Sequence, residues 1–486
     1  MGVPLVTLSR RYVRLSLRLI VPLLSCAALL ACAGTAAAAP AAGGPDAGTF
    51  VWPEPLEYAL PGMNTVTTVL DGPGASVYEV ALVGSLRDAE GSHASVAVTR
   101  VACGSGRVLW RYLYEAPQGW RAESDSAAVA PNGDIVVVGY EVAGDADAAR
   151  WFVCRLRASD GKRRWLRTTG SSVGEDAAPF GVAVDADGCA FVSGVVTPAS
   201  ADPAPRHEGL LVKYDRRGRQ LWTVSLASTA NDTFEGVAPD GQGGVFVTGR
   251  RLADFKTKTG KCLLARYDRS GRRMWARQTC DGLWSPSAPV LAGDRIYVSV
   301  YGWSSWMDQQ RPFVKRYTPR GALEWTRYVD GLPGDVRYAN DLAVDAAGDI
   351  VIAGGAAKNV AVPGGPDLES VGWVAKFRHR TGKRLWTSWF YNDSGDDAFG
   401  GYVHALDTDR QGRVYLGGSW GMDASGAGYA PVVVRYAAET GLPAKRWLMG
   451  GEGDCYALLA GADGVYAGCG IGEYPDGTSA LYRLRP

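Results

Sequence analysis

The amino-acid sequence predicts an all-β fold built from one four-stranded unit that recurs along the chain. Three observations support this prediction. The phrase G-x-x-x-W occurs six times, and successive tryptophans lie 50 to 61 residues apart. A short run of β-branched or aromatic residues, usually ending in Gly, recurs at a similar interval. The 486 residues include 63 glycines and 16 tryptophans, which suits many strands joined by tight turns.

The two recurring phrases give the number of units. The G-x-x-x-W phrase ends at Trp110, Trp165, Trp222, Trp275, Trp325 and Trp386, and a copy stretched by two residues ends at Trp447. The β-branched runs begin near residues 80, 135, 190, 245, 296, 350, 414 and 465. These eight runs predict eight units, with seven as the alternative if one unit is irregular.

Each unit is predicted to contain four antiparallel strands, called a to d. In one unit, strand a is FGVAVD (180–185), strand b is AFVSG (190–194), strand c is LLVKYD (210–215), and strand d carries the tryptophan. Tight a–b and c–d turns contain Asp, which bonds turn backbone, and Gly, which adopts positive φ without strain. We expect the tryptophan to pack on the neighbouring sheet. The basic residues of KYDRRGRQLW (213–222) are expected to lie on a solvated outer edge.

Four antiparallel strands repeated every ~50 residues describe the blade of a β-propeller. The pattern K-Y-D-x-x-G-x-x-x-W, with D-x-x-G before the next apolar run, resembles the bacterial propeller repeat called SBBP over residues 48–486. It is also similar to the quinoprotein repeat, which implies a dehydrogenase using pyrroloquinoline quinone. That class commonly has adjacent cysteines over the cofactor. This chain has no Cys-Cys pair, so we expect no cofactor.

The last unit ends after its strand c and has no tryptophan of its own. The segment TFVWPEPL (49–56), which carries Trp52, precedes the first strand a. We expect it to complete the eighth blade as its outer strand, where Pro53 and Pro55 are tolerated because no N–H is needed. Such closure would join the two ends of the propeller and remove open sheet edges.

Residues 1–31 are predicted to be an export signal, and residues 32–47 a disordered tether before the propeller at 48–486. Four arginines precede the apolar stretch LIVPLLSCAALLA (19–31), and SRRYVR (9–14) resembles a twin-arginine signal. The sequence LLAC (29–32) resembles a bacterial lipobox, which makes Cys32 the expected lipidation site. Ordinary cleavage within 36–39 would instead release a periplasmic or secreted protein.

The variable b–c and d–a loops are expected to form the binding face, because binding residues concentrate on loops held by a rigid scaffold. Its candidate ligand-binding residues are aromatic: Trp284, Trp303, Trp306, Trp120 and Trp420. They would stack on a sugar or on a partner's apolar group, unless they fold down and pack the loops. Acidic residues of the d–a loops, such as Asp125 and Asp454, would attract a cation or bond loop backbone.

Candidate catalytic chemistry rests on His404, which lies on a predicted strand a beside the central channel. The four histidines lack metal-ligand spacing, so we expect no metal site. Seven cysteines follow Cys32, and Cys455 with Cys469 is the candidate disulfide because the two fall on neighbouring strands. The remaining odd number leaves at least one free thiol.

Composition and motifs leave three functional hypotheses. The 51 Lys and Arg balance 50 Asp and Glu, which argues against nucleic-acid binding. We expect a monomeric, non-enzymatic envelope lipoprotein that binds an envelope protein or glycan, with the membrane reached only through the lipid. The alternatives are a carbohydrate or cell-wall binding module, and a propeller enzyme of the lyase or quinoprotein type.

Overall fold

The structure is a computed structural model. It describes residues 49–52, 55–58, 65–83, 95–143, 149–169, 176–198, 206–227, 231–254, 259–281, 285–301, 311–334, 336–361, 367–393, 398–421, 428–461, 463–472 and 478–486. The predicted export signal, Cys32 and the tether lie outside these residues. No helix is found in the described part of the chain.

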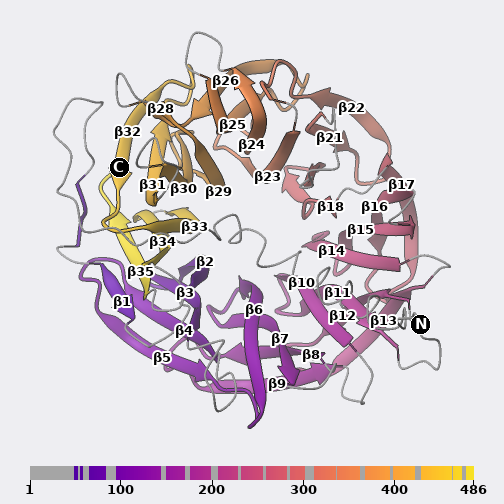
Figure 1. Cartoon of the computed structure of the whole chain (residues 1–486). Coiled ribbons are helices and arrows are strands. Elements are labelled where there is room, and N and C mark those ends of the chain that lie inside the picture. Colours follow the sequence, from indigo (N-terminus) through magenta and orange to yellow (C-terminus); the bar gives the residue numbers. More distant parts are fainter. Residues whose placement is uncertain are drawn as a thin grey trace, which may run out of the picture.

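Eight antiparallel sheets form a closed ring, which confirms the predicted eight-bladed β-propeller (Figure 1). Blade 1 consists of β2 (Thr65–Gly72), β3 (Ser76–Val83), β4 (Ser95–Ala102) and β5 (Val108–Tyr114). Blade 2 consists of β6 (Trp120–Val129), β7 (Ile135–Ala143), β8 (Ala149–Leu156) and β9 (Arg163–Thr169). Blade 3 consists of β10 (Asp176–Val184), β11 (Ala190–Thr197), β12 (Glu208–Tyr214) and β13 (Gln220–Leu226). Blade 4 consists of β14 (Asn231–Pro239), β15 (Val245–Asp254), β16 (Thr259–Tyr267) and β17 (Arg273–Asp281).

The second half of the ring includes the irregular blade and the closing blade. Blade 5 has a first strand split into β18 (Ser285–Pro286) and β19 (Val290–Ala292), followed by β20 (Arg295–Tyr301), β21 (Phe313–Tyr317) and β22 (Leu323–Tyr328). Blade 6 consists of β23 (Val336–Val344), β24 (Ile350–Ala361), β25 (Asp367–Phe377) and β26 (Arg384–Phe390). Blade 7 consists of β29 (Gly401–Thr408), β30 (Val414–Gly421), β31 (Tyr429–Tyr436) and β32 (Pro443–Leu448), and a small hairpin of β27 (Asn392–Asp393) and β28 (Ala398–Phe399) precedes it. Blade 8 consists of β33 (Gly453–Gly461), β34 (Gly464–Ile471), β35 (Thr478–Leu484) and β1 (Leu56–Tyr58).

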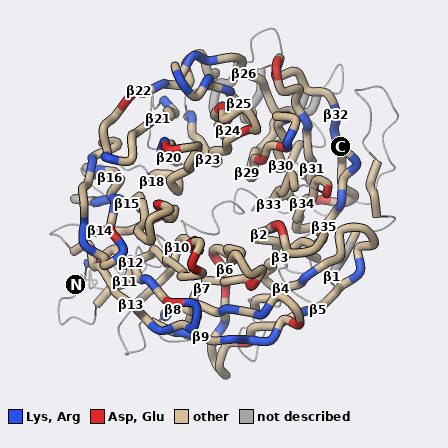
Figure 2. The backbone as a smooth tube through the Cα atoms, turned by 180° about the vertical axis from the view of Figure 1, so that it is seen from behind, with Lys and Arg blue, Asp and Glu red and all other residues tan. Residues whose placement is uncertain are grey.

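The burial of each strand follows from its place in the blade. Second and third strands, such as β7 and β12, are almost fully buried, because neighbouring blades cover both of their faces. Their sequences are therefore near-continuous apolar runs. Outermost strands such as β9 are largely exposed, and the buried residue of β9 is Trp165. Figure 2 shows Lys and Arg along outer strands such as β5 and β9, and acidic residues on inner strands such as β2 and β6.

The recurring tryptophan fastens each blade to the c–d turn of the next blade. The indole N–H of Trp165, in blade 2, donates to the carbonyl of Arg216 in blade 3 at 3.1 Å. The ring lies against Gly218 of that turn, where an added Cβ would come within 2.6 Å of the indole. Equivalent N–H bonds run from Trp52, Trp110, Trp222, Trp275, Trp386 and Trp447. We call this contact the tryptophan clasp, and it explains why Gly and Trp recur together in one phrase.

A second link between blades was not expected from the sequence. Each strand c has a cation at the position equivalent to Lys213. Lys213 is buried, and its ammonium donates to the carbonyl of Gly243 in the next blade at 2.7 Å. Its charge is balanced by Asp185 of its own a–b turn, at 3.5 Å. Cross-blade bonds of this kind also come from Arg100, Arg155, Arg316, Lys376 and Arg483. In six of the eight blades the basic residue of strand c is thus a structural part of the ring.

The predicted closure of the ring is confirmed. Strand β1 pairs with β35, and Phe50 forms a further bridge with Leu484. Trp447 of blade 7 donates to the carbonyl of Thr49, and Trp52 donates to that of Cys103 in blade 1. The N-terminal segment therefore supplies both halves of the clasp that blade 8 would otherwise lack.

Substitution of two glycines by Ala can distinguish the effect of the clasp contact on stability from that of backbone strain. Gly161 (φ +68°) faces Trp110, whose nearest ring atom would lie 2.5 Å from an added Cβ, whereas Gly241 (φ +73°) has nothing within 4 Å. We expect Gly241→Ala to lower the free energy of unfolding by about 1–2 kcal/mol through positive φ alone. Gly161→Ala should lower the free energy of unfolding by about 2 kcal/mol more than Gly241→Ala does, because the indole of Trp110 must move. Urea unfolding of both variants measures the difference, and equal losses would contradict the clasp.

Candidate functional site

The innermost strands β2, β6, β10, β14, β18, β23, β29 and β33 surround the centre of the ring (Figure 1). Seven of the eight blades have a β-bulge in this strand at an equivalent position. The bulged residues are Thr67, Asp125, Phe180, Glu235, Asn340, His404 and Tyr456. We call these seven residues the bulge ring. Bulges re-aim side chains and are frequent beside functional sites.

The bulge ring was not found from the sequence, although a positional signal exists. Each bulged residue lies five positions before the residue that opens the a–b turn, as His404 does before Asp409. Residue type gives no signal, because the seven positions hold seven different amino acids. Several of the side chains reach the next blade: Thr67 contacts Ser124 at 3.0 Å, and His404 contacts Asp454 at 2.9 Å.

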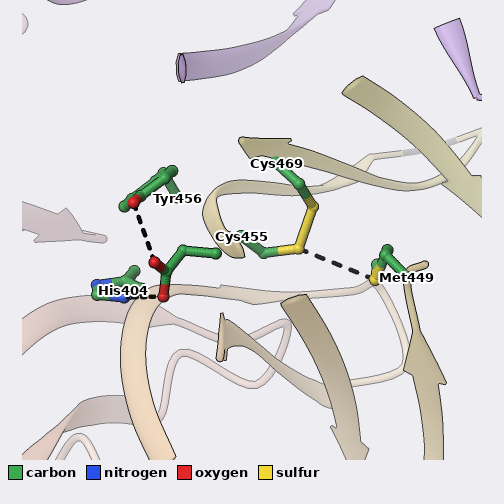
Figure 3. The surroundings of a disulfide bond; sticks show 6 residues. His404, Met449, Cys455, Tyr456 and Cys469 are labelled. Atoms are coloured by element: carbon green, nitrogen blue, oxygen red, sulfur yellow. Dashed lines mark hydrogen bonds and ion pairs between the residues drawn. A yellow bond between two sulfur atoms is a disulfide. The ribbon is translucent and has the colours of Figure 1, made fainter. Parts of the chain in front are cut away.

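His404, the sequence candidate for catalysis, lies at the junction of blades 7 and 8 (Figure 3). Its Nε2 is 2.9 Å from Oδ1 of Asp454, and the hydroxyl of Tyr456 donates to Oδ2 of the same carboxylate at 3.1 Å. Burial alone would raise the pKa of Asp454, but hydrogen bonds from His404, Ser419 and Tyr456 hold it below its usual value. Asp454 is therefore a stable anion that orients the imidazole.

The surroundings of His404 favour a role in holding the two blades together. Its side chain is only 8% exposed, and Nδ1 is buried with no hydrogen-bond partner among the described residues. The imidazole ring also packs on Tyr456, with 5.1 Å between ring centroids. A catalytic acid or base must come within hydrogen-bond reach of the substrate, and this burial leaves little access to it.

The bulge of blade 2 presents a different chemistry. Both carboxylate oxygens of Asp125 are buried, and neither has a hydrogen-bond partner among the residues that the structure describes. Burial and the nearby Glu123 raise the pKa of Asp125 well above its usual value. Glu123 accepts the hydroxyl of Tyr140, whose pKa burial also raises. A buried carboxyl with a raised pKa beside a second acid marks a functional-site candidate, because the arrangement is unfavourable for the fold itself.

Other acids of the inner strands serve the ring. Burial raises the pKa of Asp341 to about 7, although its carboxylate accepts the backbone N–H of Leu342 and of Leu406 in the next blade. Asp407 likewise accepts the backbone N–H of Ala460 at 2.8 Å. Asp341 was among the acids expected either to attract a cation or to bond loop backbone, and it bonds backbone; Asp407 was not among them. Other acids of the predicted rim lie outside the described residues: Glu175, Asp335, Asp396 and Asp397.

Of the five candidate tryptophans, Trp284, Trp303 and Trp306 lie outside the described residues. Trp120 begins β6 and is half-buried, with the guanidinium of Arg150 4.7 Å from its ring centroid. Trp420 belongs to β30 rather than to a loop and is only 5% exposed, packed on Phe390. Trp420 therefore presents no free face on which a ligand could stack.

Two disulfides cross neighbouring strands. Cys455 and Cys469, the pair favoured from the sequence, face each other on β33 and β34 and are bonded. Cys262 and Cys280 are bonded across β16 and β17. The sequence reasoning missed this second pair, although their hairpin positions are symmetric about one turn. Cys103, Cys154 and Cys189 are free thiols.

The described residues contain neither a metal-binding cluster nor a membrane-spanning helix. Nowhere in it do three or more His, Cys, Asp or Glu residues gather closely enough to hold a metal ion. Within the same residues there is no helix of the length and hydropathy needed to span a membrane.

Comparison with known proteins shows the fold. No protein-family model matches the sequence, and no curated protein matches it. Among solved structures, the quinohemoprotein alcohol dehydrogenase ADHIIG of Pseudomonas putida is 12% identical, with a TM-score of 0.52 over 90% of this chain and 76% of that one. Sqt1 of Chaetomium thermophilum is 11% identical (TM-score 0.45, 88% and 100% covered), as is the polysaccharide lyase Uly1 (TM-score 0.41, 86% and 90% covered). The first of these, at 12% identity, shows a shared fold and nothing about activity.

The perturbed carboxyl of Asp125 makes a pH-dependent prediction. Its pKa is higher in the folded than in the unfolded chain, so folded protein retains a proton that unfolded protein has lost above about pH 4. The contribution of Asp125 to stability therefore falls as pH rises. Asn mimics the neutral acid, so Asp125→Asn should raise the free energy of unfolding at pH 8 by at least about 1 kcal/mol and have little effect near pH 4.

Urea unfolding at both pH values measures this effect, with the exposed Asp187→Asn as the matched control. A destabilised Asp125→Asn at pH 8 would show that the carboxylate is ionised and satisfied in the folded protein.

Proposed function

We propose that this protein is an exported, envelope-anchored propeller that acts as a non-enzymatic binding or scaffold module. It would bind through the face formed by its b–c and d–a loops and by the adjoining channel wall. One observation carries the proposal: the scaffold positions of the repeat hold the same residues from blade to blade, whereas the bulge ring holds seven different ones.

This contrast supports binding because the two sets of positions share one backbone environment. Packing demands are similar in every blade, so positions that serve only the fold converge on Trp, Gly, Asp and a basic residue. Positions that serve an asymmetric ligand have no such reason to repeat. The bulge ring thus gives a nearly symmetric ring an asymmetric inner wall, which suits recognition of a ligand or partner.

The position of the bulges favours the b–c and d–a face. Bulged residues lie near the start of strands that begin at the d–a loops: Thr67 is the third residue of β2, and His404 is the fourth of β29. The opposite face consists of tight turns whose Asp side chains bond turn backbone, as Asp215 does with the N–H groups of Arg217 and Arg219. Asp125 belongs to the bulge ring at this end of the strands, and its buried carboxyl, whose pKa burial raises, has no hydrogen-bond partner among the described residues.

A propeller enzyme is the second candidate, and the contact between His404 and Asp454 is the observation that favours it. An imidazole oriented by a carboxylate is a common acid–base arrangement. We favour a binding function over an enzymatic one, because Nδ1 of His404 is buried. A carbohydrate-binding module is an outcome of the test below, since the sequence predicts three of its candidate tryptophans in the b–c and d–a loops.

The proposed location rests on the N-terminal residues. The arginine-rich start, the apolar stretch of 19–31 and the lipobox-like LLAC support export followed by lipid attachment at Cys32. We expect cells that produce the protein to incorporate labelled palmitate into it and to lose the label in Cys32→Ser. Labelling that persists in this variant would contradict anchoring at Cys32.

Site-specific photocrosslinking in the envelope tests which face binds. A photoreactive residue at Trp120, where β6 leaves its d–a loop, should give one discrete crosslinked product. The same residue at Arg217, in a c–d turn, should give none. A protein adduct supports a scaffold and a glycan adduct supports the carbohydrate-binding alternative. Products from position 217 alone would contradict the assignment of the face.

A further inference from the structure

The tight-turn face contains a pocket where blades 5 and 6 meet. It is lined by the β19–β20 turn (residues 292–295), Tyr297, Arg316, Gly348, His379 and Arg380. This pocket lies on the face opposite to the proposed binding surface. It therefore belongs to neither the bulge ring nor the loops, and an inference about it does not rest on the proposed function.

The pocket occurs where blade 5 departs from the repeat. In blades 2, 3, 4 and 6 an Asp of the a–b turn pairs with the strand-c cation, as Asp240 does with Arg266 at 2.8 Å. The corresponding turn of blade 5 is shortened, and its Asp294 points outward with a side chain 77% exposed. Arg316 pairs instead with Glu324 of strand d, at 3.1 Å. The shortened turn leaves space that the longer turn fills elsewhere.

The tryptophan clasp is also incomplete at this junction. The indole N–H of Trp325 is buried and has no partner in the described chain, unlike that of Trp165. The carbonyl of Arg380 accepts Nη1 of Arg316 at 3.0 Å, and the carbonyl of His379 accepts the hydroxyl of Tyr297 at 3.4 Å. Local rules that fail at one place in a repeat are expected to mark function.

The pocket gathers more positive than negative charge. Arg295 and Arg316 share the single carboxylate of Glu324, and Arg295 also pairs with Asp294. The exposed guanidinium of Arg380 forms no ion pair within the described residues. Three guanidinium groups thus face two carboxylates. Glu324 and Asp294 hold Arg295 in place, which reduces the entropy lost when a ligand binds.

We propose that this pocket binds a phosphate group. Guanidinium groups present planar pairs of N–H donors that match phosphate oxygens. A tetrahedral dianion offers oxygens to several guanidinium groups at once and carries more charge than one carboxylate. Arg380 is the residue with an uncommitted fork, so it contributes most to affinity, while Arg295 and Arg316 line the wall behind it.

Calorimetric titration of the full chain with pyrophosphate, at constant ionic strength, tests the proposal. We expect saturable one-site binding that weakens at least tenfold in Arg380→Ala. Arg216→Ala is the matched control, because Arg216 is also an exposed arginine of a c–d turn whose carbonyl accepts a cross-blade bond. This control should bind as the unmodified protein does.

Three results would overturn the proposal. They are the absence of saturable binding, equal loss of affinity in both variants, and binding of citrate without binding of pyrophosphate. Because Arg380 is exposed, Arg380→Ala should fold, and an unchanged thermal unfolding midpoint in ligand-free buffer verifies this. If Arg380→Ala does not fold, Arg380→Lys keeps the charge but loses the planar fork and should still weaken binding severalfold.

Discussion

The tryptophan clasp is the interaction on which the rest of this structure depends. Each blade alone is a small twisted sheet whose two faces are apolar, and it is stable only when neighbours cover both. The clasp sets the spacing of those neighbours, because one indole fills the concave side of a positive-φ glycine and donates to the same turn, as Trp165 does at Gly218. The buried strand-c cations fasten the same junctions a second time. Among the described residues, the clasp hydrogen bond is present at every junction except that of blades 5 and 6, and Thr49 and Trp52 supply it on both sides of blade 8 from the other end of the chain.

In a ring fastened in this way, residues can vary at two kinds of position without opening the ring. The inner wall can change residue by residue, because the bulge position is not used by the clasp, and the bulge ring shows how far it has changed. A junction can also be altered as a whole, as between blades 5 and 6, where a shorter turn and an unpartnered Trp325 accompany a pocket. The two places lie on different faces and present different chemistry. The bulge ring contains Asp125, whose pKa burial raises, whereas the pocket gathers arginines that suit an anion.

The sequence predicted the architecture well because the scaffold repeats. Eight blades followed from eight recurring β-branched runs, and the strand order and the closing segment followed from the Gly, Trp and Asp that recur with them. The candidate site was harder to predict, because its residues do not repeat from blade to blade. Asp125 and the other bulged residues share a position but no residue type, so repetition does not reveal them. Lys213 was grouped with solvated basic residues, because its burial depends on the adjoining blade. Trp420 was placed in a loop, although β30 extends through it.

The blades are fastened by the hydrogen bond of the indole N–H as well as by the apolar surface of the indole. Replacing Trp by Phe keeps an aromatic ring and removes the N–H. Trp165 and Trp325 are matched for the comparison, being 7% and 8% exposed and each packed on the next turn's glycine, but only Trp165 has an indole acceptor. The measurement is the free energy of unfolding of Trp165→Phe and Trp325→Phe. We expect Trp165→Phe to lower the free energy of unfolding by about 1 kcal/mol more than Trp325→Phe does. Equal losses, or a larger loss at Trp325, would show that apolar packing alone holds the ring.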